Sequence, residues 1–591
     1  MTDSAAARFW GVEEGYHDIF GKWHETDLAT LSSLIDAVSA GRAEPSAPPR
    51  PEHMQAFQGD GSRRWGLAVQ LYAVRSASNW GIGDFSDLLT ILDVAAWSGA
   101  DAVGINPLHA LFLDRPENAS PYAPNSRLFI NPLYIDVTAI PEFYSAGEPV
   151  PADRIEELRA SNLIDYAGVA ALKERMLRVA YYGFYEGGDA GRKAAFAAFR
   201  TEQGEKLKRF SCFEALRRRF RQVSWRDWPE PWRSADPQAL AELRASEDRE
   251  CGFHEFLQWT AYQQLAACKL RARERGMDIG LYLDLAVGVD AGGADSWSNQ
   301  RAVLSSYSVG APPDEFNPGG QDWGLAPFNP HVLADNDFAV FRELLGATMR
   351  HAGAVRLDHV LGLMRLFLVP HGAHPSQGAY IRFPFERLLR VIAEESHRYR
   401  CVFIGEDLGT VPEGFRETAA RWGVWSYRVM MFERGAQGEF KPPQDYPAQA
   451  LATFTTHDLS TFRGWTSGED LNIKRAIGIN PGENEASRQR ARDALKRALD
   501  RLDPALSPED FSAIAFYLAT TPARLVMVGA EDMFDMVEQV NVPGTTDQHP
   551  NWRRKLPVAV EKWAAGETWR NVTAAFERAG RNKPRGPATP E

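Results

Sequence analysis

Short apolar runs recur along the chain, and most are separated by stretches with the periodicity of amphipathic helices. Continuous apolar runs of this length are typical of strands that are buried on both faces. Eight such strands alternating with helices predict an α/β fold, a (β/α)8 TIM barrel with insertions. The eight runs are Trp65–Tyr72, Ala102–Leu108, Ile279–Asp284, Ala354–Asp358, Cys401–Glu406, Trp425–Phe432, Ala452–His457 and Leu525–Val528.

Interruptions of this alternation set the expected domain boundaries. Residues 1–60 predict a helical segment followed by a Pro-rich linker. We expect the first part of the barrel at 61–140, a mostly helical insertion at 141–250 and the remainder of the barrel at 251–575. Residues 576–591 are rich in Pro, Gly and charge, which predicts a flexible tail.

Composition excludes several classes of protein. The formal net charge is −12, whereas proteins that track phosphates carry the opposite sign, so no nucleic-acid partner is expected. The four cysteines contain no C-x-x-C pair, so neither a zinc ribbon nor a redox dithiol is indicated. Aromatic residues make up 11% of the chain, which suits either sugar stacking or ordinary core packing.

The chain shows no sign of export or membrane insertion. Its first residues lack the cationic segment and apolar stretch of a signal peptide. The most apolar long stretch, Ser512–Ala530, is interrupted by Pro522 and Arg524 and predicts a buried helix followed by a strand. We therefore expect a cytoplasmic protein with no membrane partner.

Acidic residues stand at the ends of four predicted strands: Asp284, Asp358, Glu406 and Asp458. In a (β/α)8 barrel the carboxyl ends of all strands meet at one mouth. One such residue alone is easily explained as a helix cap or an ion-pair partner. Four at one mouth favour a catalytic cluster.

Motifs for other chemistries are missing or incomplete. Neither H-E-x-x-H nor G-x-S-x-G occurs, and His371 and His374 lack a third ligand nearby. The segment Gly81–Gly83 lacks the third glycine of a dinucleotide-binding loop. No metal site is therefore expected.

Paired carboxylates suit glycoside chemistry. One must be ionised to attack or stabilise an oxocarbenium-like centre, and the other protonated to expel the leaving oxygen. Arg356 lies two residues before Asp358 and so faces the same side of its strand, where it can keep that acid ionised. His359 and His457 are further donors beside the acids. A general acid needs a raised pKa, which spacing alone does not reveal for Glu406.

Three strings around these acids resemble the catalytic signatures of the 4-α-glucanotransferases known as amylomaltases or disproportionating enzymes, glycoside hydrolase family 77. They are VRLDH at 355–359, GEDLG at 405–409 and THDL at 456–459. Further likeness lies at a first barrel loop (79–85), a substrate-contacting loop (120–136), a third-strand signature (282–288), a lid loop (310–324) and a last barrel segment (541–553). The resemblance extends from about Arg64 to Lys562.

The resemblance implies roles for particular residues. Asp358 would be the nucleophile, Glu406 the acid/base and Asp458 the transition-state stabiliser. Asp284, Arg356, His457 and Asn541 would line the subsite of the cleaved sugar, while Tyr122, Gln321, Trp323 and His359 would contact the glucan. The implied activity is transfer of α-1,4-glucan segments between maltooligosaccharides and glucans, as donor and acceptor, through a covalent glucanyl–Asp intermediate. No cofactor is implied.

The chain departs from the family pattern in two places. Ser460 stands where the family usually has proline after His-Asp-Leu, so the backbone near Asp458 loses a rigid φ angle and an altered rate is expected. Some relatives carry a longer β-rich amino-terminal domain, which residues 1–60 are too few to form.

Two alternatives stay open on the sequence. A retaining α-glucan hydrolase of the same clan would use the same acids but pass the glucan to water. A non-catalytic glucan-binding protein with a relict barrel would bind without forming product. Preferred chain length and oligomeric state are not written in the sequence.

Overall fold

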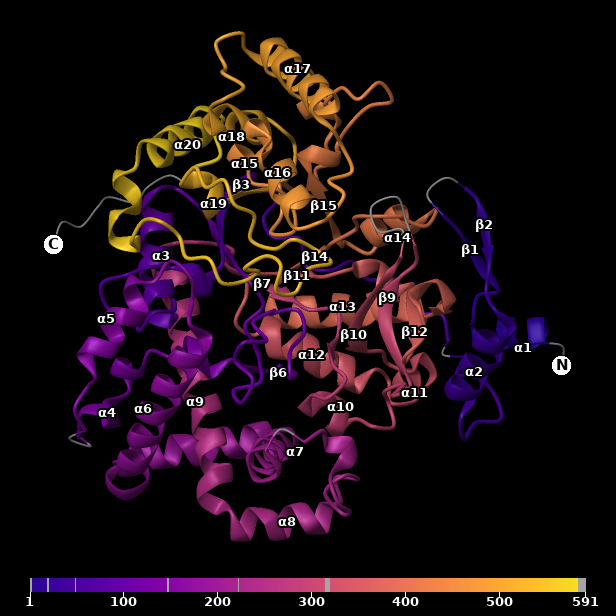
Figure 1. Cartoon of the computed structure of the whole chain (residues 1–591), viewed down its shortest axis with the longest axis vertical. Coiled ribbons are helices and arrows are strands. Elements are labelled where there is room, and N and C mark those ends of the chain that lie inside the picture. Colours follow the sequence, from indigo (N-terminus) through magenta and orange to yellow (C-terminus); the bar gives the residue numbers. More distant parts are fainter. Residues whose placement is uncertain are drawn as a thin grey trace.

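The computed structural model describes residues 3–18, 21–47, 49–145, 148–221, 223–313 and 319–582. Eight parallel strands close into a barrel whose spatial order follows the chain (Figure 1). The predicted TIM barrel is confirmed, with a strand at each of the eight apolar runs. The strands are β3 (Arg64–Val69), β4 (Ala102–Ile105), β7 (Gly280–Leu285), β11 (Ala354–Leu357), β14 (Val402–Gly405), β15 (Trp425–Val429), β16 (Ala450–Thr453) and β17 (Leu525–Gly529).

Burial explains why these runs form strands. Every residue of β4, β7, β11, β14 and β16 is buried, as expected for strands covered by helices outside and packed side chains inside. Local signals start the covering helices. Asp84 caps α3 (Phe85–Trp97) through the amides of Ser86 and Asp87, and Pro384 precedes α13 (Phe385–Tyr399).

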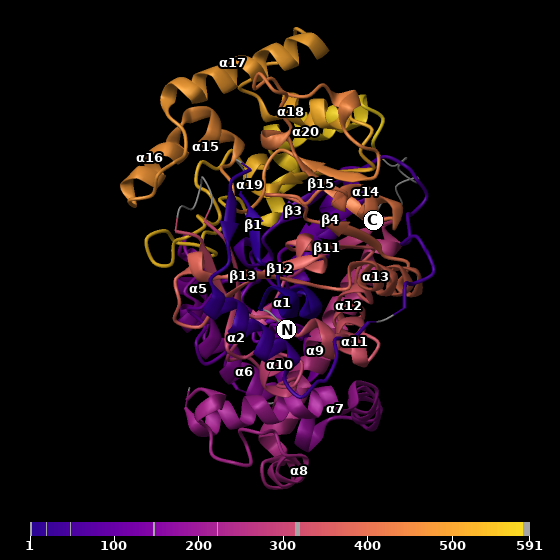
Figure 2. The same cartoon turned by 90° about the vertical axis from the view of Figure 1, so that its right-hand side faces the viewer.

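Helices extend the barrel at both ends of the long axis of the molecule. Residues 141–250 hold α4 (Pro141–Ser145), α5 (Ala152–Ala160), α6 (Tyr166–Gly187), α7 (Ala190–Phe220), α8 (Pro237–Ser246) and the start of α9 (Asp248–Glu274). Both views place α7 and α8 at one end of the molecule and α17 (Glu485–Leu502) at the other (Figures 1 and 2).

The amino-terminal segment contains more than the predicted helical pattern. It holds α1 (Asp3–Trp10), α2 (Leu28–Ser39) and a hairpin of β1 (Gly15–His17) and β2 (Trp23–Glu25). Val12 forms an antiparallel bridge with Ile381 and the amide of Glu13 donates to the carbonyl of Tyr380, so this segment pairs with the edge of a second sheet.

That second sheet includes part of the region expected to be a lid loop. Its order is β13 (Ala379–Arg382), β12 (Arg365–Pro370), β9 (Tyr307–Ala311), β10 (Gln321–Ala326) and β8 (Val289–Asp290), with antiparallel pairing. Residues 310, 311 and 321–324 are therefore strand, because β9 pairs with β10 on one side and with β12 on the other. Residues 314–318 lie outside the described residues.

Residues 576–582, expected to belong to the flexible tail, are packed into the fold instead. The ring of Phe576, in α20 (Glu567–Arg578), stacks on Trp65 at 4.5 Å between centroids. Arg581 is fully buried and donates to the carbonyls of Ala519, Arg64 and Thr521. Residues 583–591, the remainder of the predicted tail, lie outside the described residues.

Across the described ranges, no helix is long and apolar enough to cross a membrane.

Candidate active site

A buried arginine joins two of the strand-end carboxylates. Arg356 on β11 donates from one terminal nitrogen to both oxygens of Asp284 on β7, each at 2.8 Å. Its other terminal nitrogen donates to Asp358 at 2.8 Å. The arrangement follows from register, because Arg356 and Asp284 are paired positions of neighbouring parallel strands. The pairing satisfies a guanidinium whose side chain is only 8% exposed.

Backbone amides hold the third acid. Glu406 follows β14, and its carboxylate accepts from the amides of His359 at 2.9 Å and Leu408 at 3.0 Å. His359 has a φ of +47°, which few residues other than glycine adopt, and this turn aims its amide at Glu406. The acid at the end of β14 is thus fixed by the loop that carries Asp358.

Side chains from the last barrel segment hold the fourth acid. The amide of Asn541 donates to Asp458 at 2.6 Å, and His457 lies 3.5 Å from the other oxygen of that carboxylate. Gln539 donates to the main-chain carbonyl of Asp458 at 2.7 Å. The side chain of Asp458 remains 44% exposed, so its carboxylate is open to solvent and to a ligand.

Aromatic rings form one wall of the site. The Tyr122 hydroxyl donates to Asp284 at 2.5 Å, and its ring stacks on His457 at 4.9 Å between centroids. Trp552 lies against both rings, at 5.6 and 5.3 Å. Its φ of +60° is another positive backbone angle at a site residue.

The second sheet also contributes residues to the site. The ring of Trp323 on β10 meets that of His359 edge-to-face at 5.2 Å. Its indole nitrogen donates to Gln321 at 3.0 Å. This strand therefore lies beside the loop that carries Asp358 and binds Glu406 through the amide of His359.

All the sequence-predicted site residues belong to two contact networks at the mouth of the barrel, one around Arg356 and one linking Glu406 to the second sheet. Sequence reasoning missed three neighbours of these networks. Trp552 lies in the last barrel segment, 541–553, but its motif gave no reason to select it. Gln539 has no sequence signal. Tyr427 lies within a predicted strand, and its ring is 5.6 Å from the Arg356 guanidinium.

Burial and charge shift the acids in different directions. Burial raises the pKa of Asp358 to about 6 despite the opposing charge of Arg356. It also raises the pKa of Glu406, against Arg356 and the two amides. Partial burial would raise the pKa of Asp458 as well, but His457 and Asn541 outweigh it and lower that pKa. Asp458 in turn raises the pKa of His457.

Two cavities lie at the two ends of the strands. A mostly apolar cavity of about 60 Å³ is lined by Asp358 and His359 together with Val309 and Leu366 of the second sheet, so Asp358 borders an apolar space. A cavity of about 750 Å³ opens at the opposite, amino-terminal end of the strands and includes none of the four acids. No cluster of three or more His, Cys, Asp or Glu able to hold a metal ion is found in the part of the chain described here.

Comparison with known proteins places the chain in a family. The family model of the 4-alpha-glucanotransferases, glycoside hydrolase family 77, matches residues 69–560. A 4-alpha-glucanotransferase of Mycobacterium tuberculosis is 38% identical over 528 residues, covering 84% of this chain and 71% of the relative. That of Haemophilus influenzae is 36% identical over 527 residues, covering 83% and 75%.

Solved structures agree. The amylomaltase of Corynebacterium glutamicum matches with a TM-score of 0.84 at 27% identity, covering 97% of this chain and 99% of that one. The amylomaltase of Streptococcus agalactiae has a TM-score of 0.74 at 19% identity, covering 88% and 100%, and supports the fold alone. The chain therefore belongs to the 4-alpha-glucanotransferase family, glycoside hydrolase family 77, and is an enzyme of that type.

Proposed function

We propose that this enzyme moves α-1,4-glucan segments between maltooligosaccharides by double displacement at Asp358. The observation that carries the proposal is that Arg356 binds Asp358, His457 and Asn541 contact Asp458, and the amide of His359, next to Asp358, binds Glu406, all at one mouth of the barrel. Family membership makes α-glucans the substrate class. Donor and acceptor chains, the covalent intermediate and the role of each acid belong to the proposal.

In the first half-reaction Glu406 gives its proton to the glycosidic oxygen while a carboxylate oxygen of Asp358 attacks C1. The reducing-end fragment leaves with the proton, and a glucanyl ester remains on Asp358. Arg356 is placed to keep Asp358 ionised for this attack, whereas the raised pKa of Glu406 favours its protonated form. The ionised Asp458 would stabilise the positive charge that develops on the ring.

In the second half-reaction the Glu406 carboxylate takes the proton of an acceptor 4-hydroxyl, whose oxygen attacks C1 and displaces Asp358. Two inversions leave an α linkage. Transfer exceeds hydrolysis only where a sugar hydroxyl, rather than water, is held against the ester. Trp323, with Gln321 beside it, is the candidate for that role because it lies on the second sheet against His359.

Maltotriose as sole substrate tests the reaction class. We expect glucose together with maltopentaose and longer chains, at a constant number of reducing ends. Rising reducing ends with maltose and glucose as products would indicate a hydrolase instead, and binding without any product would support the glucan-binding alternative.

The covalent intermediate can be tested by separating the two halves of the reaction. In the Glu406→Gln variant with α-maltosyl fluoride, departure of fluoride needs no acid catalysis, but the second half lacks its base. We expect a maltosyl ester to accumulate on the peptide containing Asp358, detected by mass spectrometry. The double variant Glu406→Gln, Asp358→Ala is the control and should show no adduct; an adduct located elsewhere would contradict the assignment.

The raised pKa of Asp358 predicts an acidic limit to the rate. Attack needs the ionised carboxylate, so kcat/KM should fall about tenfold per pH unit below about 6. In the proposed mechanism Glu406 is protonated while Asp358 is ionised, and its raised pKa favours that form. Glu406→Gln, which mimics the neutral acid, should therefore leave the acidic limb in place when assayed with the fluoride donor. A limb that moves to lower pH would contradict a protonated Glu406 in the reactive form.

Trp323→Ala tests the acceptor side. Deleting residues 310–324 would dismantle two strands, so a point substitution is the cleaner change. We expect the ratio of hydrolysis to transfer to rise several-fold, because water gains access to the ester. The ratio is measured as new reducing ends per glucose released from maltotriose. Phe432→Ala, which changes an exposed aromatic ring outside these networks, is the control; an unchanged ratio in Trp323→Ala would overturn the role.

A further inference from the structure

The loop that carries Asp458 contains the position where the family pattern is broken. It connects β16 to α15 (Phe462–Ser467), and Ser460 lies two residues after Asp458. Proline would fix the φ angle at this position, whereas serine leaves it free. If the carboxylate of Asp458 must be held in place, another constraint has to act on the loop here.

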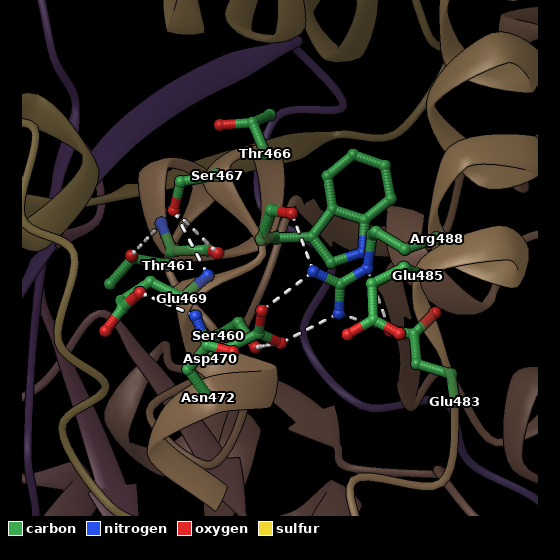
Figure 3. Close-up of polar contacts among 12 residues, drawn as sticks. Ser460, Thr461, Thr466, Ser467, Glu469, Asp470, Asn472, Glu483, Glu485 and Arg488 are labelled. Carbon is green, nitrogen blue, oxygen red and sulfur yellow. Dashed lines mark hydrogen bonds and ion pairs between the residues drawn. The ribbon is translucent and has the colours of Figure 1, made fainter. Parts of the chain in front are cut away.

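The side chain of Ser460 makes such a constraint. Its hydroxyl donates to Asp470, in α16 (Glu469–Ala476), at 2.6 Å (Figure 3). Both residues are only 4% exposed, so water does not compete for this bond. The main chain of Ser460 is held as well, because its carbonyl accepts the hydroxyl of Thr455 at 2.8 Å. The bond from Thr455 to Ser460 closes the loop around Asp458, and the bond from Ser460 to Asp470 fixes that loop to α16.

Asp470, which accepts the hydrogen bond from Ser460, is itself firmly held. Arg488 of α17 donates to both oxygens of Asp470, at 2.7 and 2.8 Å, and to the carbonyl of Trp465 at 2.6 Å (Figure 3). Its Nε also donates to Glu483 at 2.9 Å. Burial would raise the pKa of Asp470, but Arg488 and Ser460 outweigh it and lower that pKa, so this acid is ionised at neutral pH. Because Arg488 pairs with it independently of Ser460, Asp470 stays in place when the serine hydroxyl is removed.

We infer that Ser460 is a positioning residue for Asp458, and that the buried Asp470–Arg488 ion pair anchors it. The hydrogen bond to Asp470 substitutes for the rigid φ angle of a proline and fixes the loop against helices outside the barrel. The inference rests on the proposed role of Asp458. It deepens that role by coupling the rate to helices α16 and α17, which contribute no group to the site.

Substitutions at Ser460 test this directly. Ser460→Ala removes the hydroxyl, and we expect kcat with maltotriose to fall about tenfold while KM and the melting temperature stay close to wild type. Ser460→Pro should restore most of the lost kcat by fixing φ. No partner of the Ser460 amide is found among the residues that the structure describes, so proline removes no hydrogen bond there. Thr466→Ala, which removes a hydroxyl of α15 bonded to the Phe462 and Arg463 carbonyls of the same helix, should leave kcat unchanged.

A double-variant cycle separates positioning from a general loss of stability. With α-maltotriosyl fluoride as donor, Ser460→Ala should lower the rate in the wild-type background but not in Asp458→Asn, because its effect passes through that carboxylate. An equal loss in both backgrounds would overturn the inference, as would an unchanged kcat in Ser460→Ala.

If Asp458 does not have its proposed role, the variants behave differently. Near-normal turnover in Asp458→Asn would remove the proposed function of that acid, whatever Ser460 does. If Ser460→Ala fails to fold, the proline variant decides: wild-type kcat supports a constraint on the backbone, and a tenfold loss overturns it.

Discussion

The pairing of Arg356 with Asp284 and Asp358 is the interaction on which the active site depends. A guanidinium buried at the mouth of a barrel is stable only when carboxylates satisfy it, and breaking such a buried set costs several kcal/mol. The same cation sets the chemistry, because it opposes the desolvation that raises the pKa of Asp358. Four carboxylates around one arginine and one histidine also leave a site suited to the positive charge of an oxocarbenium-like ring.

The remaining acids are held by different means. Backbone amides fix Glu406, whereas a carboxamide and a histidine hold Asp458. This division keeps the environments of the acids distinct, as a reaction needing one ionised and one protonated carboxyl requires. The proposed role of Ser460 fits this scheme. Ser460 connects the loop to the buried Asp470–Arg488 ion pair, and that pair lies outside the site.

The barrel and the acids at its mouth are readable from the sequence because they depend on local patterns. An apolar run that ends in Asp358 or Glu406 predicts both the strand and the place of the acid at its carboxyl end. Six residues of the expected lid loop, 310, 311 and 321–324, are strand instead, because β9 is held by β12, a strand distant in sequence whose pairing has no local signature. Gln539 and the packing of Arg581 depend on contacts of the same long-range kind. The replacement of proline by Ser460 is visible in the sequence, but its partner Asp470 emerges only from the fold.

Closure of the barrel has a consequence for the order in which the protein is made. The ring is completed only when β17 pairs with β3, and Asp458 acquires its partner Asn541 only from the segment that follows β17. A chain emerging from the ribosome thus carries all three reactive acids before Asp458 can meet Asn541 and before the ring can close. The complete site arrives at a late stage of synthesis, because a chain interrupted before residue 541 lacks the side chain that holds Asp458.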